Sequence, residues 1–176
     1  MARLWGGEAS WVRGAQNGSV PELEALFREH WPRAHRAAYL VVQDAAAAED
    51  IAQEAFLAAI RALDSFDRRR PFGPWLHRIV VNRAIDWGRA RALRREVGLD
   101  GVPEPAAGME PRAERADELA GALAELVPEQ RAVIVLRYLL DYTPGEIAKL
   151  LDLPRGTVNS RLRRGLDRIA EGLEWT

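Results

Sequence analysis

Apolar residues recur along most of the chain at intervals of three and four, which is the spacing of one face of an α-helix. The strict alternation that is typical of a strand is not evident. The pattern predicts a helix over residues 21–42 and a second over residues 44–66, with Asp44 as its cap. A third helix is predicted over residues 75–95, with Pro74 at its first position.

Residues 96–111 break the helical pattern, because they are rich in proline, glycine and acidic residues. Helices are predicted again at about 112–126 and 128–140, followed by a short helix, a turn and a final helix. The sequence therefore predicts an all-α protein. Its two small helical domains, residues 10–95 and 112–176, would be joined by a flexible acidic linker.

The last part of the chain has the pattern of a helix-turn-helix. Thr143 and Glu146 have the spacing of a capping box, and residues 152–154 leave room only for a tight turn. The final helix is predicted to bury four apolar residues, namely Val158, Leu162, Leu166 and Ile169. Its opposite side carries arginine, hydroxyl and amide side chains, which suit phosphates and base edges. A solvated surface helix would have a similar composition, but the coincidence of cap, turn and basic side favours DNA binding.

The net charge of −1 conceals a strong pattern. Residues 61–95 hold ten arginines and three aspartates, residues 96–126 hold two arginines and eight acids, and residues 155–168 hold five arginines and one aspartate. Two basic segments separated by an acidic one suggest surfaces for a polyanion.

The helix that contains Asp50 has two unlike sides. One side is apolar and suits a core, whereas Asp50, Glu54, Leu57, Arg61 and Asp64 form a separate stripe at helical spacing. A leucine among carboxylates suggests a protein partner. The pattern alone does not distinguish this interpretation from a single exposed leucine, which is common.

The first basic segment combines arginines with aromatic residues, namely Phe66, Phe72, Trp75 and Trp87. Single-stranded nucleic acid is bound in this way, by stacking for the bases and cations for the backbone. An extruded base would also need a pocket, which the loop at residues 67–73 could provide. Alternatively, the two tryptophans belong to the core.

Several classes of protein are disfavoured. The absence of cysteine excludes disulfides and thiolate metal sites, and no apolar run is long enough for a membrane span. The segment from Met1 to Gly7 lacks the apolar stretch of a secretory signal. Neither an HExxH motif nor a glycine-rich phosphate loop occurs, so no catalytic residue, metal or cofactor is expected.

Two separate segments resemble a known family. "DAAAAEDIAQEAFLAAIRALDSFD" followed by "FGPWLHRIVVNRAIDWGR" resembles the sigma-two domain of bacterial RNA polymerase sigma factors of the extracytoplasmic-function class. "LVPEQRAVIVLRYLLDYTPGEIAKLLDLPRGTVNSRLRRGL" resembles their sigma-four domain, and residues 11–42 fit the opening helices of sigma-two.

The resemblance implies three binding surfaces. Core polymerase would be bound through its beta-prime clamp helices by Asp50, Gln53, Glu54, Phe56, Leu57 and Arg61, with the beta flap as a second contact. The minus-ten element would be opened and held by Phe66, Asp67, Arg68, Arg69, Arg70, Phe72, Trp75, Arg78, Asn82, Arg83, Asp86 and Arg89. The minus-thirty-five element would be recognised as duplex by Arg155, Thr157, Asn159, Ser160, Arg161, Arg163 and Arg164.

The resemblance also implies a cytoplasmic protein without membrane insertion that an anti-sigma factor holds inactive. The chain departs from the family pattern at Gly73-Pro74, at Asp152 and at Asn159, which affects promoter preference more than class. The alternative function is a free-standing helix-turn-helix regulator. That alternative would leave the first basic segment and the stripe on residues 50–64 without a role.

Overall fold

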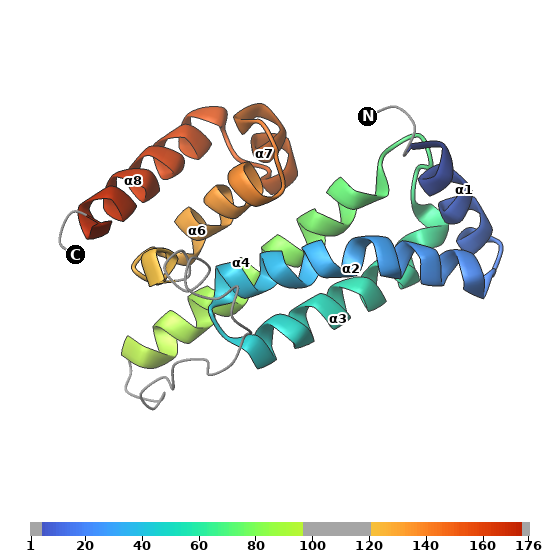
Figure 1. The fold of residues 1–176 in the computed structure, drawn as a ribbon, viewed down its shortest axis with the longest axis horizontal. Coiled ribbons are helices and arrows are strands. Elements are labelled where there is room, and N and C mark those ends of the chain that lie inside the picture. The colour runs from blue at the N-terminus through green and yellow to red at the C-terminus, as the bar shows by residue number, and fades with distance from the viewer. Residues whose placement is uncertain (1–4, 97–120, 174–176) are drawn as a thin grey trace.

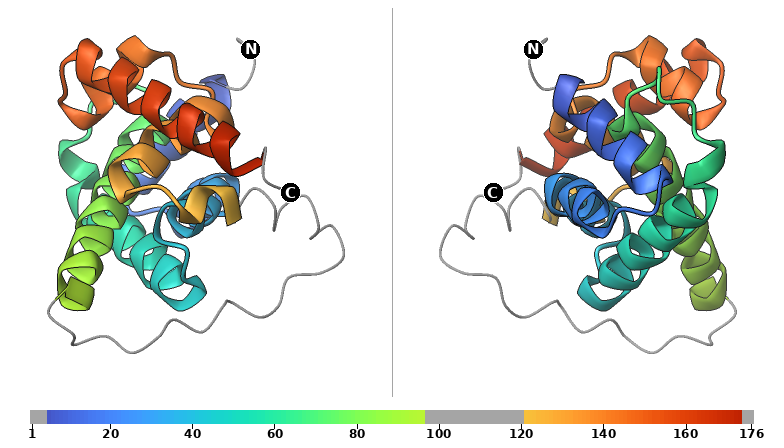
Figure 2. Two further views of the ribbon diagram at one scale, coloured as in Figure 1. Left: turned by 90° about the vertical axis from the view of Figure 1, so that its left-hand side faces the viewer. Right: turned by 90° about the vertical axis from the view of Figure 1, so that its right-hand side faces the viewer.

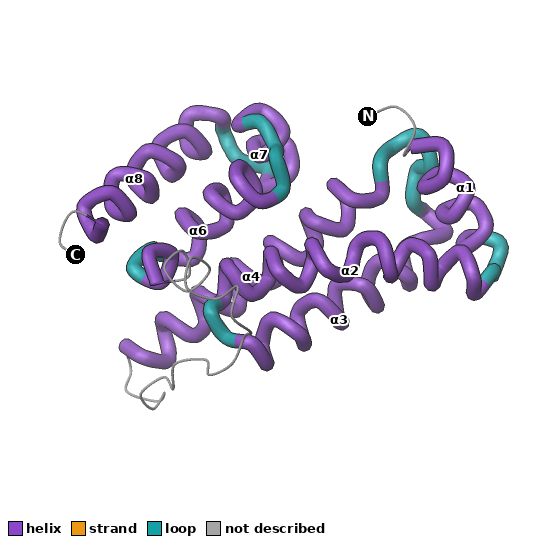
Figure 3. The backbone as a smooth tube through the Cα atoms, viewed as in Figure 1, coloured by secondary structure: helices purple, strands orange, loops and turns teal. Residues whose placement is uncertain are grey.

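The computed structural model describes residues 5–96 and 121–173. The first part consists of four helices and a short 3₁₀ segment, namely α1 (Trp5–Gln16), α2 (Val20–Val42), α3 (Ala45–Ala62), the 3₁₀ turn Leu63–Ser65 and α4 (Phe72–Glu96) (Figure 1). The second part contains α6 (Pro128–Ile134), the π-helical turn Val135–Leu139, α7 (Pro144–Leu151) and α8 (Arg155–Leu173). Within these described ranges no strand occurs, which confirms the all-α prediction (Figure 3).

Local signals set the start of α3. Gln43 adopts the left-handed conformation (φ 57°) that ends α2, and the Asp44 carboxylate accepts the Ala47 N–H at 3.0 Å. The same carboxylate pairs with Arg91 of α4 at 2.9 Å, so one residue caps α3 and ties it to α4. The predicted cap is confirmed.

Two helix boundaries differ from the prediction. α3 ends at Ala62, and the chain tightens into the 3₁₀ turn before Phe66 leaves it in extended conformation. α4 begins at Phe72, earlier than predicted. Pro74 is tolerated there because the N–H groups of the first helical turn have no intrahelical partner to lose.

The helix-turn-helix forms as predicted. The Thr143 N–H donates to the Glu146 carboxylate at 2.8 Å, and the Glu146 N–H donates to the Thr143 hydroxyl at 3.3 Å. Asp152 ends α7 in the left-handed conformation with φ 54°. The helix predicted over residues 128–140 instead changes from α to π at Val135. The predicted linker, residues 96–111, and most of the helix predicted at 112–126 lie outside the described residues.

The two parts share one hydrophobic core. α6 packs against both α2 and α4, and α7 packs against α4 (Figures 1 and 2). Buried residues from both parts, such as Leu76 and Val81 of α4 and Ala132 of α6, belong to one continuous cluster. This packing brings the helix-turn-helix against the first part.

Candidate protein and nucleic-acid interfaces

The stripe on α3 is exposed. Asp50, Gln53, Glu54 and Arg61 are open to solvent, and the Leu57 side chain is 49% exposed. The opposite side of the helix packs into the core, as predicted. Phe56 differs from its neighbours in the predicted surface because it is 4% exposed and its ring lies 4.9 Å from that of Phe27.

The stripe is joined to α4 by an ion pair. The Arg83 guanidinium donates to the Glu54 carboxylate at 2.8 Å. Both side chains are largely exposed, so the pair is worth little in stability. It nevertheless links a residue predicted to bind protein with one predicted to bind DNA.

The loop between the 3₁₀ turn and α4 has an aromatic floor. Phe66 and Phe72 are 8% and 3% exposed, and the ring of Trp75 lies 4.6 Å from that of Phe66. Above this floor the three arginines of the loop, Arg68, Arg69 and Arg70, are exposed. The loop therefore combines a fixed apolar base with cations open to solvent.

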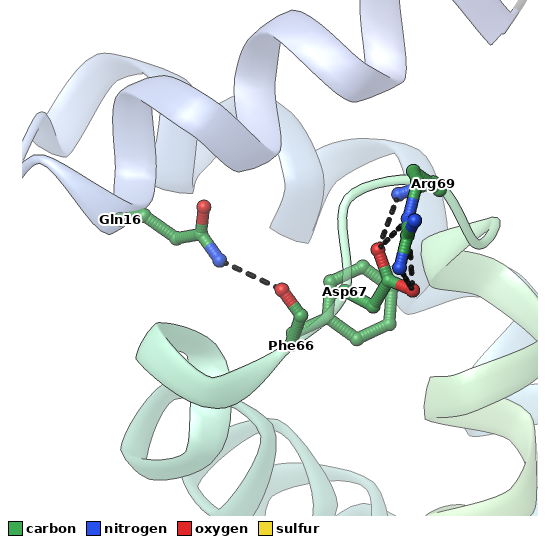
Figure 4. A network of polar contacts seen from close by, with 4 residues as sticks. All are labelled: Gln16, Phe66, Asp67 and Arg69. Atoms are coloured by element: carbon green, nitrogen blue, oxygen red, sulfur yellow. Dashed lines mark hydrogen bonds and ion pairs between the residues drawn. The ribbon is translucent and has the colours of Figure 1, made fainter.

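Asp67 gives the loop its local shape. Its carboxylate accepts the backbone N–H of Arg69 at 3.0 Å and the Arg69 guanidinium at 3.0 Å (Figure 4). The Arg70 N–H closes a turn onto the Asp67 carbonyl at 2.9 Å. The bonds to Arg69 hold the pKa of the Asp67 carboxyl below its ordinary value, so the turn is stabilised by an ionised aspartate at neutral pH.

α4 has an exposed polar face. Arg78, Asp86 and Arg89 are exposed and Asn82 is half-buried, whereas the neighbouring Ile85 is 6% exposed. The polar face therefore follows residues 78, 82, 86 and 89, because Ile85 belongs to the shared core. Arg89 also donates to Glu129 of α6 at 2.5 Å.

α8 presents a continuous polar face. Arg155, Asn159, Arg163 and Arg164 are exposed, and Thr157, Ser160 and Arg161 are half-buried. Val158 and Leu162 are buried as predicted, whereas the prediction for Leu166 is wrong, because this side chain is 39% exposed. Gly165, and not Leu166, packs against α6, where a Cβ on this glycine would lie 2.7 Å from Ile134 Cδ1.

Sequence reasoning missed several polar residues that join distant segments. Gln16 of α1 bonds to the carbonyls of Leu63 and Phe66, and Glu8 of α1 bonds to Gly73 (Figure 4 shows the Phe66 contact). His77 of α4 forms a hydrogen bond between its Nδ1 and the Tyr142 hydroxyl at 2.8 Å. These partners are 47 to 65 residues apart along the chain, so no local spacing could have indicated them.

The described residues lack two other kinds of feature. No group of three or more histidine or acidic side chains that could hold a metal ion occurs among residues 5–96 and 121–173. Across these residues, no helix has the length and apolarity needed to cross a membrane.

Both parts of the chain match models of one protein family. The family model for sigma-70 region 2 matches residues 26–95, and that for sigma-70 region 4 matches residues 116–169. The chain is 35% identical over 147 residues to the ECF RNA polymerase sigma factor SigM of Mycobacterium tuberculosis, covering 84% of this chain and 74% of SigM. It is 32% identical over 179 residues to the ECF sigma factor SigW of Bacillus subtilis, covering 92% of each chain.

A solved structure matches both parts of the chain together. CnrH, in complex with the cytosolic domain of CnrY, superimposes with a TM-score of 0.71 at 27% identity and covers 96% of this chain and 97% of CnrH. The two family models match in the order region 2 and then region 4, and together they cover more than half of the chain. The chain belongs to the extracytoplasmic-function class of RNA polymerase sigma factors.

Proposed function

We propose that the three surfaces divide the work of transcription initiation. The stripe on α3 binds core RNA polymerase, with Leu57 at its centre. The loop at residues 66–72 and the polar face of α4 open and hold the minus-ten element. α8 lies in the major groove of the minus-thirty-five element, where Arg164 and its neighbours contact phosphates and base edges.

Leu57 is the observation that carries this proposal over a free-standing regulator. It is a half-exposed leucine set among the exposed Asp50, Glu54 and Arg61, on a helix remote in sequence from the helix-turn-helix. A regulator that acts alone has no use for such a surface. An apolar side chain ringed by charges is the composition of an interface centre with a polar rim.

The remaining roles follow from this one. The chain acts together with core polymerase, whose active site makes the transcript. It works in the cytoplasm, where polymerase is. We also propose that a protein inhibitor of the anti-sigma type covers the same surfaces, because CnrH was solved with the cytosolic domain of CnrY bound.

The test is a Leu57→Ser substitution. Loss of an apolar side chain from the centre of an interface costs about 1–2 kcal/mol, so we expect affinity for core polymerase to fall by about tenfold. Leu93→Ser is the matched control, because Leu93 is a 62% exposed leucine near the end of α4, away from the stripe. Affinity is measured with a fluorescent label on the chain, and run-off transcription is measured from a promoter fragment upstream of its gene.

Either of two results would overturn the proposal. Equal affinity of wild type and Leu57→Ser for polymerase would remove the stripe as a polymerase surface. Tight, specific binding of a duplex by the chain alone, with no transcript in the presence of polymerase, would favour the free-standing regulator.

A further inference from the structure

We propose that α1 positions the loop at residues 66–72, by fixing its first residue through Gln16 and the first turn of α4, which follows the loop, through Glu8. The proposal rests on the function proposed for this loop in promoter opening. α1 lies before the segment matched by the region 2 family model, which begins at residue 26. The function proposed above uses α3, the loop, α4 and α8, but not this helix.

Gln16 holds the start of the loop. Its amide nitrogen donates to the Leu63 carbonyl at 2.8 Å. It also donates to the Phe66 carbonyl at 3.0 Å, as Figure 4 shows. The amide NH₂ group has two hydrogens, so a single side chain satisfies both carbonyls. Leu63 is the first residue of the 3₁₀ turn, and Phe66 follows its last residue in extended conformation (φ −73°, ψ 128°). Gln16 therefore holds both ends of the turn that leads into the loop.

Glu8 holds the other end. Its carboxylate accepts the Gly73 N–H at 3.3 Å, at the first turn of α4, where backbone N–H groups lack intrahelical partners. The same oxygen lies 2.9 Å from Nε2 of His30 in α2. Burial raises the pKa of Glu8, but the contacts with His30 and with the Gly73 N–H outweigh it, and the carboxyl stays ionised at neutral pH.

The two contacts come from one rigid helix. Glu8 and Gln16 are eight residues apart, or about 12 Å along the axis of an α-helix. Val12, midway between them, is 2% exposed and anchors α1 in the core. The spacing of the two contacts is therefore set by a helix that is itself fixed.

The loop's own bonds are local by comparison. The turn formed by Asp67, Arg69 and Arg70 shapes its tip, and the rings of Phe66 and Phe72 meet at 5.9 Å beneath it. These contacts leave the position of the tip relative to α4 to its two ends. We infer that α1 sets where the exposed arginines of the loop are held when DNA arrives.

The experiment uses Gln16→Glu in the full chain with core polymerase. This change keeps the size of the side chain but replaces the donor with a carboxylate that faces two carbonyl oxygens. We expect opening of a duplex promoter, followed by a fluorescent base analogue in the minus-ten element, to slow by about tenfold, which corresponds to about 1.4 kcal/mol. Transcription from a template already melted at that element, and affinity for core polymerase, should stay within about twofold.

Gln43→Glu is the matched control, because the side-chain amide of Gln43 donates to the carbonyl of the nearby Leu40 at 3.1 Å, within its own part of the chain. It should leave opening unchanged. Gln16→Met, which removes the donor without adding charge, decides the question if Gln16→Glu unfolds in a thermal melt. We expect Gln16→Met to slow opening of the duplex by a few fold.

Arg70→Ala separates failure of this proposal from failure of the proposed function. Slow opening by Arg70→Ala with normal opening by Gln16→Glu and Gln16→Met would overturn the role of α1 and leave the role of the loop intact. Normal opening by all three variants would overturn the role of the loop itself. An equal loss on duplex and melted templates, or weaker polymerase binding, would mean that Gln16 supports the fold and does not position the loop.

Discussion

His77 is a buried titratable residue at the boundary between the two parts of the chain. It is 5% exposed and bonded to the Tyr142 hydroxyl at 2.8 Å. Burial, together with the nearby charges of His30 and Arg33 and against the opposing charge of Glu8, lowers the pKa of His77 to about 4. The pKa of His77 in the folded state is below its unfolded value of about 6.5. The contribution of neutral His77 to the free energy of unfolding is therefore fully present above pH 6.5 and is lost as the pH falls toward 4.

We predict the size of this loss from the two pKa values. Between pH 7 and pH 5 the His77 contribution to the free energy of unfolding should fall by about 2 kcal/mol. Denaturant unfolding of wild type and His77→Phe at both pH values measures it, and the variant should show a smaller decrease by that amount. Parallel decreases in the two proteins would mean that His77 does not govern this pH range.

At the scale of single residues, the sequence predicted which side chains are exposed better than what they contact. The stripe around Leu57 and four of the five arginines of α8 are open to solvent as expected, because helical spacing decides which side of a helix faces outward. The contacts of Gln16 and Glu8 could not be predicted. They depend on which turn of α1 lies over the loop, and that is set by tertiary packing.

At the scale of elements, the predictions succeeded where the chain carries a local signal. Asp44 and the pair Thr143 and Glu146 cap helices as their spacing indicated. The boundary at Phe72 and the side of α8 near Leu166 were misjudged. In α8 a close approach to α6 at Gly165 rotates the buried face, and an apolar periodicity carries no information on such an approach.

The turn between α7 and α8 offers a test of element geometry. Asp152 has φ 54°, a conformation that costs most residues about 1 kcal/mol and glycine almost nothing. Asp152→Gly should therefore leave stability unchanged or raise it by up to about 1 kcal/mol, whereas Asp152→Val should lower it by more than 1 kcal/mol because a β-branched residue resists this conformation. Thermal unfolding of the three proteins gives the order, and a loss for glycine equal to that for valine would contradict the argument.

At the scale of the whole molecule, the sequence predicted two domains but not the packing between them. The acidic linker in the sequence predicted two separate helical domains. In the structure, however, Ile85 of α4 and Ala132 of α6 belong to one core. Arg89 of α4 also pairs with Glu129 of α6 across the boundary between the two parts. Arg89 is among the residues proposed to hold the minus-ten element. Because this ion pair occupies part of the proposed DNA surface, we predict that promoter binding requires the contact between Arg89 and Glu129 to break.

The two parts approach closely at Gly88, and a substitution there tests this prediction. A Cβ at this position would lie 2.7 Å from Cγ and 2.9 Å from Cβ of Pro128, whose ring cannot rotate away. Gly88→Ala should push α4 and α6 apart and weaken the contact by about 1–3 kcal/mol. We expect the free chain to show a larger radius of gyration in small-angle scattering and tighter binding of single-stranded minus-ten DNA.

Gly172→Ala is the matched control, because the structure describes no atom within 4 Å of a Cβ placed there. It should leave the radius of gyration and the DNA affinity unchanged and gain up to about 1 kcal/mol in helix stability. If Gly88→Ala expanded the chain without strengthening DNA binding, the contact between Arg89 and Glu129 would be no barrier to the promoter. If it strengthened binding while the control did not, the packing of the second part against α4 would itself restrain the free sigma factor from binding DNA.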